Sequence, residues 1–360
     1  MAKWMSTARV AVAAITLILT ASCGSSEQKN AAKRHDFNIG WSIYAGWMPW
    51  PYAQKAGIVK KWADKYGVTI NLVQVNDYVE SVNQFNAGKL DGVTVTNMDA
   101  LTIPAAGGKD TSAIILGDYS DGNDGIVLKN ASSLADIKGR TVYLVELSVS
   151  HYLLARGLST VGLTMADVKT VNTSDADIVG AFANPSVTAA VTWNPQLTEL
   201  ATMPKAKLAF SSHQLPAEIL DLLAVDTATL KANPNLGKAL AGIWYETIGL
   251  MQQQNATGAA ARADMAKMAG STPEAFEAQL RTTHLYATPK DAVAAITSPT
   301  LANTMVKVRD FSFSKGLFGT GATSPDAIGI AMPGKTLGDP ANVKLRFDPS
   351  FMEQAAAGKL

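Results

Sequence analysis

Two apolar runs set the architecture of this chain, FNIGWSI at residues 37–43 and TINLVQV at residues 69–75. Both are short and rich in β-branched or aromatic residues, as buried strands are. Between them, Pro51 begins a segment in which apolar side chains recur every three or four residues as far as Gly67, which is typical of a helix with one buried face. The order strand, helix, strand predicts an α/β fold with a largely parallel sheet.

The same alternation continues along the chain. Asp77 and Glu80 form a capping-box pattern that predicts a helix ending at Gly88, and further strands are expected at 92–96 and 111–116. A second α/β unit is expected from a helix over 148–162 and strands at 126–128, 141–145, 169–171, 189–191 and 207–210. Helices predominate from about residue 228, and the final stretch is punctuated by Gly and Pro with weak periodicity.

The N-terminus carries the marks of an export signal. Lys3 and Arg9 precede an apolar run over 10–19, and small residues lead from it to Cys23. The run is too short to span a bilayer, which needs roughly 18 or more apolar residues. Cys23 is the single cysteine, and its position resembles the bacterial lipoprotein signal, in which this thiol is acylated. We expect a signal peptide over 1–22, lipidation at Cys23 and a flexible tether over 23–36; an ordinary secretory signal is the alternative.

The composition limits the kinds of domain and binding partner that the protein can have. Apolar residues make up 47% of the chain, which predicts a packed core, and 360 residues suffice for two domains after the signal is removed. The loss of Lys3 and Arg9 leaves 29 basic against 30 acidic side chains, a net charge of −1. No basic surface for nucleic acid is therefore implied. The four histidines show no ligand spacing, so neither a metal nor a cofactor is expected.

Four short motifs resemble elements of the periplasmic solute-binding proteins of the nitrate, sulfonate and taurine group. They are AGKLDG at 87–92, DIKGRTV at 136–142, GLTMADV at 162–168 and AAVTWNP at 189–195. Each is short, and their shared order and spacing carry the resemblance.

The resemblance implies a type II periplasmic-binding-protein fold, in which two α/β lobes joined by a two-strand hinge clamp a ligand by hinge closure. Lobe one would comprise 37–117 and 215–333, lobe two 118–214, and 334–360 a C-terminal extension. It also implies the role of substrate-binding component of an ABC importer. Such a protein works as a monomer with a permease and an ATPase, in the periplasm or on the outer face of the cell membrane. Contact with the membrane would be through the lipid anchor only.

Five loops at expected strand ends should face the cleft, and they hold aromatic and acidic side chains but no Lys or Arg. The candidate ligand-binding residues in them are Trp41, Tyr44, Trp47, Asn97, Asp99, Asp118, Asp121, Glu146, Ser148, Ser150 and Trp193. Structural roles remain open for many of these residues. The aromatics can be core residues, and the turn from Asp121 can be merely solvated. Glu146 can pair with Arg140 or Arg156, and the serines can cap a helix.

The residue types in these loops favour a small nitrogen-rich ligand. An aromatic face attracts a cation by roughly 0.5 to 2 kcal/mol, and a carboxylate accepts two parallel N–H bonds from a planar guanidinium. We therefore expect a guanidine- or urea-like solute, with the cation preferred. The alternative is an anion such as taurine, an alkanesulfonate or nitrate, held by backbone N–H groups at the helix that begins near Ser148.

Catalysis is not expected from this sequence. Some relatives of the fold make the thiamin pyrimidine with a histidine and cysteines, whereas the one cysteine here belongs to the signal. No nucleophile elbow of the form G-x-S-x-G occurs. A thiamin-pyrimidine-type enzyme and an adhesive surface lipoprotein are the remote alternatives.

Overall fold

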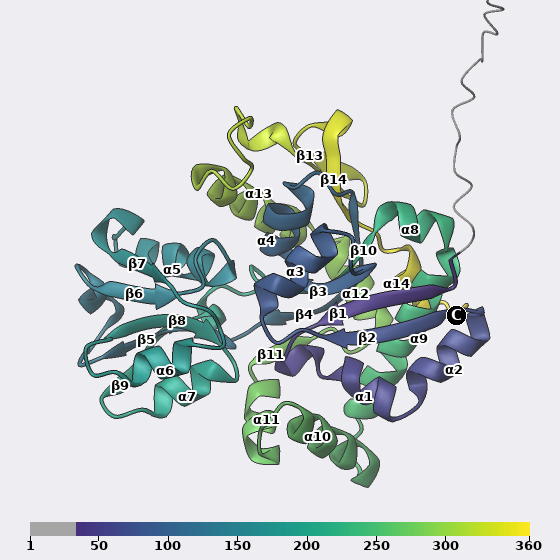
Figure 1. Ribbon diagram of the computed structural model, residues 1–360, viewed down its shortest axis with the longest axis horizontal. Helices are drawn as coiled ribbons and strands as arrows, with labels where there is room; N and C mark the ends of the chain where they lie inside the picture. The colour runs from purple at the N-terminus through teal and green to yellow at the C-terminus, as the bar shows by residue number, and fades with distance from the viewer. Residues whose placement is uncertain (1–33) are drawn as a thin grey trace, which may run out of the picture. The chain divides into compact units, whose positions relative to one another are not determined.

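The computed structural model describes residues 34–360, so the signal peptide, Cys23 and most of the expected tether lie outside the described residues. Two β-sheets organise the described chain (Figure 1). We call the nine-stranded sheet with its helices the large lobe, and the five-stranded sheet with its helices the small lobe. Among the described residues, no helix combines the length and the apolar character that a membrane crossing requires.

The large-lobe sheet has the strand order β13-β12-β14-β4-β10-β3-β1-β2, with β11 paired to β4. Its strands are β1 (Asp36–Trp41), β2 (Thr69–Gln74), β3 (Gly92–Thr96), β4 (Thr111–Ser120), β10 (Leu220–Asp226), β11 (Thr283–Leu285), β12 (Gly329–Met332), β13 (Lys335–Leu337) and β14 (Val343–Phe347). The predicted parallel pairing is confirmed for β1 with β2 and β3. The sequence analysis missed β10, which lies antiparallel between β3 and β4 because the chain enters it on its return from the small lobe.

The helices of the large lobe follow the capping signals of the sequence. They are α1 (Pro49–Lys55), α2 (Ile58–Tyr66), α3 (Tyr78–Asn86), α4 (Asn97–Ala100), α8 (Thr227–Ala232), α9 (Pro234–Met251), α10 (Ala256–Met268), α11 (Pro273–Leu280), α12 (Pro289–Ile296), α13 (Pro299–Ser314) and α14 (Ser350–Ala356). The Asp77 carboxylate accepts the Glu80 N–H at 2.9 Å, which confirms the cap of α3. The single helix expected from Pro51 to Gly67 is in fact α1 and α2, because Gly57 adopts a left-handed φ of 76° and breaks it.

Residues 334–360, expected as an extension, contribute β13, β14 and α14 to the large lobe. β14 runs parallel to β4, with Leu345 opposite Thr111. Phe351 and Met352 of α14 are buried in the main hydrophobic core. The weak periodicity of this stretch therefore reflects short elements, each of which packs on the sheet.

The small lobe has the strand order β7-β6-β8-β5-β9. It comprises β5 (Asp124–Lys129), β6 (Thr141–Leu144), β7 (Lys169–Asn172), β8 (Ala189–Trp193) and β9 (Ala206–Ser211), with helices α5 (Val149–Thr160), α6 (Ile178–Ala183) and α7 (Gln196–Thr202). Side chains alternate across a strand, so β5 contacts helices on both faces. A Cβ on Gly125 would meet Leu197 of α7 at 2.9 Å, and Ile126 lies 2.9 Å from where a Cβ on Gly157 of α5 would stand.

Two segments of chain connect the lobes. The first leaves β4 at Ser120 and enters β5 at Asp124, and the second leaves β9 and reaches β10 through residues 212–219. They are bonded to each other, since the hydroxyls of Ser120 and Ser212 are 2.7 Å apart. The Ser120 N–H also donates to the Ile219 carbonyl at 3.0 Å.

Close packing of α9 against α2 generates a stability prediction. A Cβ on Gly242 would stand 2.3 Å from the Trp62 ring, whereas Gly249 of the same helix has nothing within 4 Å of that position. Overpacking of this kind costs about 1–3 kcal/mol. We expect Gly242→Ala to lower the free energy of unfolding by that amount and Gly249→Ala to raise it by about 0.5 kcal/mol. Urea denaturation of both variants measures this, and equal midpoints would contradict the packing.

Candidate ligand-binding site

A pocket lies between the two lobes, and its roughly 360 Å³ of empty space is in part open to solvent. The large lobe contributes the turn after β1, the first residue of α3, the end of β3 and the start of β10. The small lobe contributes the first residue of β5, the first residue of α5 and the last residue of β8. The lining residues are Ser42, Ile43, Tyr44, Trp47, Tyr78, Thr96, Asp124, Val149, Trp193, Ile219 and Asp221.

Four aromatic side chains form a continuous wall of this pocket. Tyr44 packs edge-on against Trp47 with ring centroids 5.3 Å apart, and Trp47 lies 5.6 Å from Tyr78. Tyr78 then meets Trp193 of the small lobe edge-on at 5.7 Å. The wall therefore crosses from one lobe to the other.

The hydroxyl groups of the two tyrosines are already engaged on the protein side. Tyr78 donates to Asp99 Oδ2 at 2.8 Å, and its oxygen accepts the Thr96 N–H at 3.0 Å. Tyr44 donates to Asp118 Oδ1 at 3.2 Å. These contacts fix both rings and leave ring surface for the pocket.

The polar chemistry of the pocket is acidic. Asp124 and Asp221 line it, each with 4% of its surface exposed, and no Lys or Arg is among the lining residues. Asp124 is the cross-strand partner of Trp193, so the carboxyl and the indole are presented together at one end of the small-lobe sheet. Within residues 34–360 the structure contains no group of three or more His, Cys, Asp or Glu side chains arranged to hold a metal.

Burial raises the pKa values of the four carboxyl groups in and behind the pocket lining. Desolvation raises the pKa of Asp124 to about 7, opposed by a hydrogen bond from Ser120 and assisted by the charge of Asp99. Desolvation and the neighbouring carboxyl of Asp118 raise the pKa of Asp221 well above its ordinary value. Desolvation likewise raises the pKa of Asp118 to about 7 and that of Asp99 to about 6. For each of these groups the cost of burying the charged form exceeds the compensation that its hydrogen bonds supply.

Basic side chains near the site are held by another carboxylate. Glu218, just before β10, accepts from Arg156 Nε at 2.8 Å and also from Lys307. The Tyr152 hydroxyl donates to the same carboxylate at 2.8 Å. Burial alone would raise the pKa of Glu218, but these hydrogen bonds and charges outweigh it and lower the pKa to about 2. The two cations are thus both paired with one carboxylate, outside the pocket lining.

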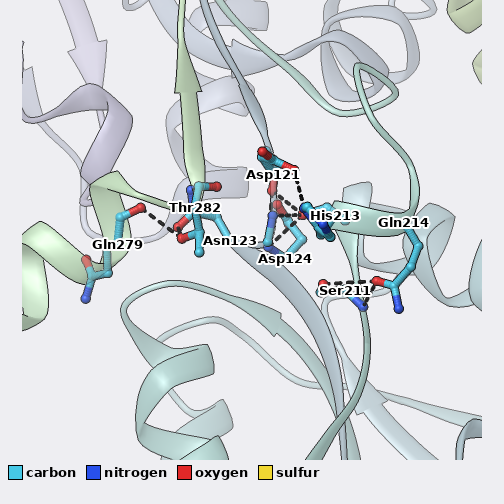
Figure 2. A network of polar contacts seen from close by, with 11 residues as sticks. Asp121, Asn123, Asp124, Ser211, His213, Gln214, Gln279 and Thr282 are labelled. Atoms are coloured by element: carbon cyan, nitrogen blue, oxygen red, sulfur yellow. Dashed lines mark hydrogen bonds and ion pairs between the residues drawn. The ribbon is translucent and has the colours of Figure 1, made fainter.

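Asn123 connects the segments around the pocket. Its amide nitrogen donates to the Thr282 carbonyl at 2.7 Å and to the Tyr44 hydroxyl at 3.1 Å. Its amide oxygen accepts from Asn194 of the small lobe at 2.8 Å. Figure 2 shows this side chain beside Thr282, with Asp124 adjacent to it. The network fixes the turn from which Asp124 enters the pocket.

The structure brings some of the predicted residues together and not others. Tyr44, Trp47 and Trp193 line the pocket. Asp99 and Asp118 lie behind this lining, where they accept hydrogen bonds from the pocket tyrosines.

The remaining predicted residues lie outside the pocket lining, for identifiable reasons. Trp41 is the buried last residue of β1. The Asn97 amide oxygen accepts the Leu220 N–H at 3.1 Å. Asp121 turns away to pair with His213 at 2.7 Å, as Figure 2 shows.

Three predicted residues at the β6–α5 turn also lie outside the pocket lining. Glu146 accepts a hydrogen bond from Thr170 and lines a separate acidic hollow with Asp77 and Asp175. Ser148 caps α5, accepting the Ser150 N–H at 3.2 Å, and the Ser150 hydroxyl is buried without a partner among the described residues.

Sequence reasoning did not select Tyr78, Thr96, Asp124 or Asp221, nor the lining residues Ser42, Ile43, Val149 and Ile219. A signal for Asp221 existed, because it is the one charged residue in the apolar run 219–225. A lone acid in a buried strand is costly unless it has a role.

Two sheets, two connecting segments and a pocket between the lobes define the periplasmic-binding-protein class of fold. The family model described as NMT1/THI5 like matches residues 52–251, more than half of the chain, and the chain belongs to this family. Proteins named as binding proteins from Brucella abortus and Brucella suis are 28% identical over 132 residues, which cover 37% of this chain and 40% of theirs.

Solved structures share the fold at low sequence identity. The alkanesulfonate-binding protein SsuA from Xanthomonas axonopodis pv. citri, bound to MOPS, has a TM-score of 0.66 at 19% identity, covering 81% of this chain and 96% of its own. The nitrate-binding protein NrtA from Synechocystis PCC 6803 has a TM-score of 0.58 at 13% identity, covering 91% and 100%. These similarities support the fold and not the ligand.

The Asn123 network generates a second stability prediction. Asn123→Ala leaves the Asn194 amide and the Thr282 carbonyl without their partner, and each buried unsatisfied group costs about 1–3 kcal/mol. We expect the free energy of unfolding to fall by about 3 kcal/mol in urea denaturation. Asn83→Ala, on the exposed face of α3, is the control and should change it by less than about 0.5 kcal/mol. Equal effects of the two substitutions would show that the network contributes little.

Proposed function

We propose that this protein is the solute-binding component of an ABC importer and that its pocket binds a small nitrogen-rich cation, of which guanidinium is the simplest example. The observation that carries the proposal is the lining itself: two buried carboxyl groups and four aromatic rings, without a basic side chain. A planar cation donates paired N–H groups to a carboxylate while its face lies on an aromatic ring.

Electrostatics favours a cation over the other small solutes. Asp124 and Asp221 are out of water, and an opposite charge at contact distance compensates an ionised carboxylate far better in this environment than in solvent. Urea brings no charge, so it does not compensate an ionised carboxylate in this way. Among the nitrogen-rich solutes, we therefore expect the charged one to bind most tightly.

An anion is the second candidate, because solved structures of the same fold are named as alkanesulfonate- and nitrate-binding proteins. The N-terminus of α5 reaches the pocket through Val149 and is the natural place for an anion. The backbone N–H of Val149, however, already faces the Asp99 carboxyl and lowers its pKa. Asp99 therefore competes for the groups that an anion needs.

Ligand capture is proposed to proceed by closure of the two lobes. The large lobe supplies Tyr44, Trp47 and Asp221, while the small lobe supplies Asp124 and Trp193. A ligand that contacts both sets stabilises only the closed arrangement, which gives the differential affinity that a population shift requires. The connecting segments 121–123 and 212–219 are the proposed hinge, within a few residues of the lobe limits at 117/118 and 214/215 that the sequence predicted.

The remaining parts of the proposal concern location and partners. We place the mature protein outside the cytoplasmic membrane, anchored through Cys23, with a permease and an ATPase as partners. The pocket lining contains no histidine or cysteine, so the site offers nothing resembling the ligands of a thiamin-pyrimidine-type enzyme.

Calorimetric titration tests the ligand class. Purified mature protein is titrated with guanidinium, methylammonium, urea, taurine and nitrate. We expect the tightest binding for guanidinium, and a loss of at least about 30-fold in affinity for Asp124→Asn, because removing one member of a buried charge pair costs 2–5 kcal/mol.

Asp121→Asn is the matched control, since its carboxyl pairs with His213 away from the pocket. Its affinity for the cation should stay within about twofold of the native value. Binding of taurine or nitrate without binding of either organic cation would overturn the proposed ligand class and leave the transport role standing.

A further inference from the structure

Behind the pocket lining, the carboxyl group of Asp118 lies beside that of the lining residue Asp221. Asp118 of β4 and Asp221 of β10 are opposite each other in the antiparallel pairing of these strands, and both are buried. The Asp118 Oδ2 atom has no hydrogen-bond donor among the described residues. Two carboxylates side by side, with one oxygen unpartnered, are best accommodated when a proton lies between them.

The surroundings of the pair leave little room for another compensating group. A Cβ on Gly46 would stand 2.5 Å from Asp118 Oδ2, so the turn after β1 closes over this oxygen. On the far side Asp221 borders a small cavity walled by Trp47, Trp50 and Trp244. A charge on both carboxyls at once would therefore be enclosed by backbone and indole rings.

The groups that act electrostatically on these carboxyls are all acids or hydroxyls. Around Asp118 and Asp221 they are Tyr44, from the turn after β1, and Asp124, from β5; Tyr286, after β11, is in turn affected by Asp118. Asp124 itself feels Asp99 of α4 and a hydrogen bond from Ser120. The basic side chains of Arg156 and Lys307 are paired with Glu218.

Building on the cation site described under Proposed function, we propose that the site works by exchange: the empty pocket holds protons on Asp124, Asp118 and Asp221, and a bound cation displaces protons to the solvent. Asp124 loses its proton and ionises against the cation. The Asp118–Asp221 pair goes from two protons to one, which the two carboxyls then share as a hydrogen bond from the protonated Asp221 to the ionised Asp118. Positive charge in the pocket is thereby nearly conserved.

The number of displaced protons follows from the pKa values. Asp124 and Asp118 each have a pKa of about 7, so at pH 7 each is about half protonated when the pocket is empty. Full ionisation of both on binding releases about one proton per ligand. Because the cation binds the ionised form, affinity should rise as pH rises through 7, by about 100-fold between pH 6 and pH 8 for two such groups.

Titration of guanidinium into the protein in buffers of different ionisation enthalpy counts these protons. We expect about one proton released at pH 7 for the native protein and about half of one for Asp118→Asn, whose amide imitates the protonated acid. Asp118→Asn should still bind and should show a shallower dependence of affinity on pH, whereas Asp121→Asn should match the native protein. Asp118→Ala should not reproduce the Asn variant, because it cannot hydrogen-bond to Asp221.

The outcomes separate this inference from the proposed function. Binding of the cation with a heat that does not depend on the buffer overturns the exchange and leaves the ligand class intact. If no cation binds, infrared titration of the empty protein still decides, through the carbonyl stretch of protonated carboxyls. Persistence of that band near neutral pH in the native protein, and its reduction in Asp118→Asn, supports the shared proton; its absence at neutral pH rejects it.

Discussion

A carboxyl group taken out of water must be compensated by a donor, a cation or a proton, and this constraint governs the centre of the molecule. Four aspartates converge there from α4, β4, β5 and β10, namely Asp99, Asp118, Asp124 and Asp221, and all are buried. Tyrosine hydroxyls satisfy part of Asp99 and Asp118. Among the residues that line the described pocket, nothing basic satisfies the other two, so ionising them in this setting of low dielectric is costly unless a cation binds.

Comparison with Glu218 shows that the lack of basic partners is specific to the pocket aspartates and does not extend to every buried acid nearby. Glu218 lies three residues before Asp221, yet Arg156 and Lys307 both bind it, and its pKa is lowered to about 2. Its contribution to stability is therefore present above the ordinary glutamate range and is lost only as the pH falls towards 2. The neighbouring pocket acids have pKa values raised by burial, so their ionisation opposes folding of the empty protein and favours a ligand of opposite charge.

Sequence alone predicted the local elements well, because their signals are local. The cap at Asp77, the apolar run from Phe37 and the placement of Trp193 at a strand end are all legible within a few residues. The pocket carboxyls were not selected because their direction depends on distant pairing. Asp121 and Asp124 stand in one turn, but only the register of β5 on β8 sends Asp124 into the pocket beside Trp193. Asp221 was missed together with β10, whose antiparallel insertion is fixed by strands more than 100 residues away.

The pairing of Asp124 with Trp193 also has a mechanical consequence. Both sit at the same end of the small-lobe sheet, on adjacent strands, so a rotation of the lobe moves carboxyl and indole together. On the opposite side, Tyr44 packs edge-on against Trp47 and donates a hydrogen bond to Asp118. A cation resting on the large lobe therefore gains a charge partner and a ring face in one step. Neither contact is available while the lobes are apart. Compensation of the buried carboxyl groups by a cation is therefore coupled to closure of the lobes.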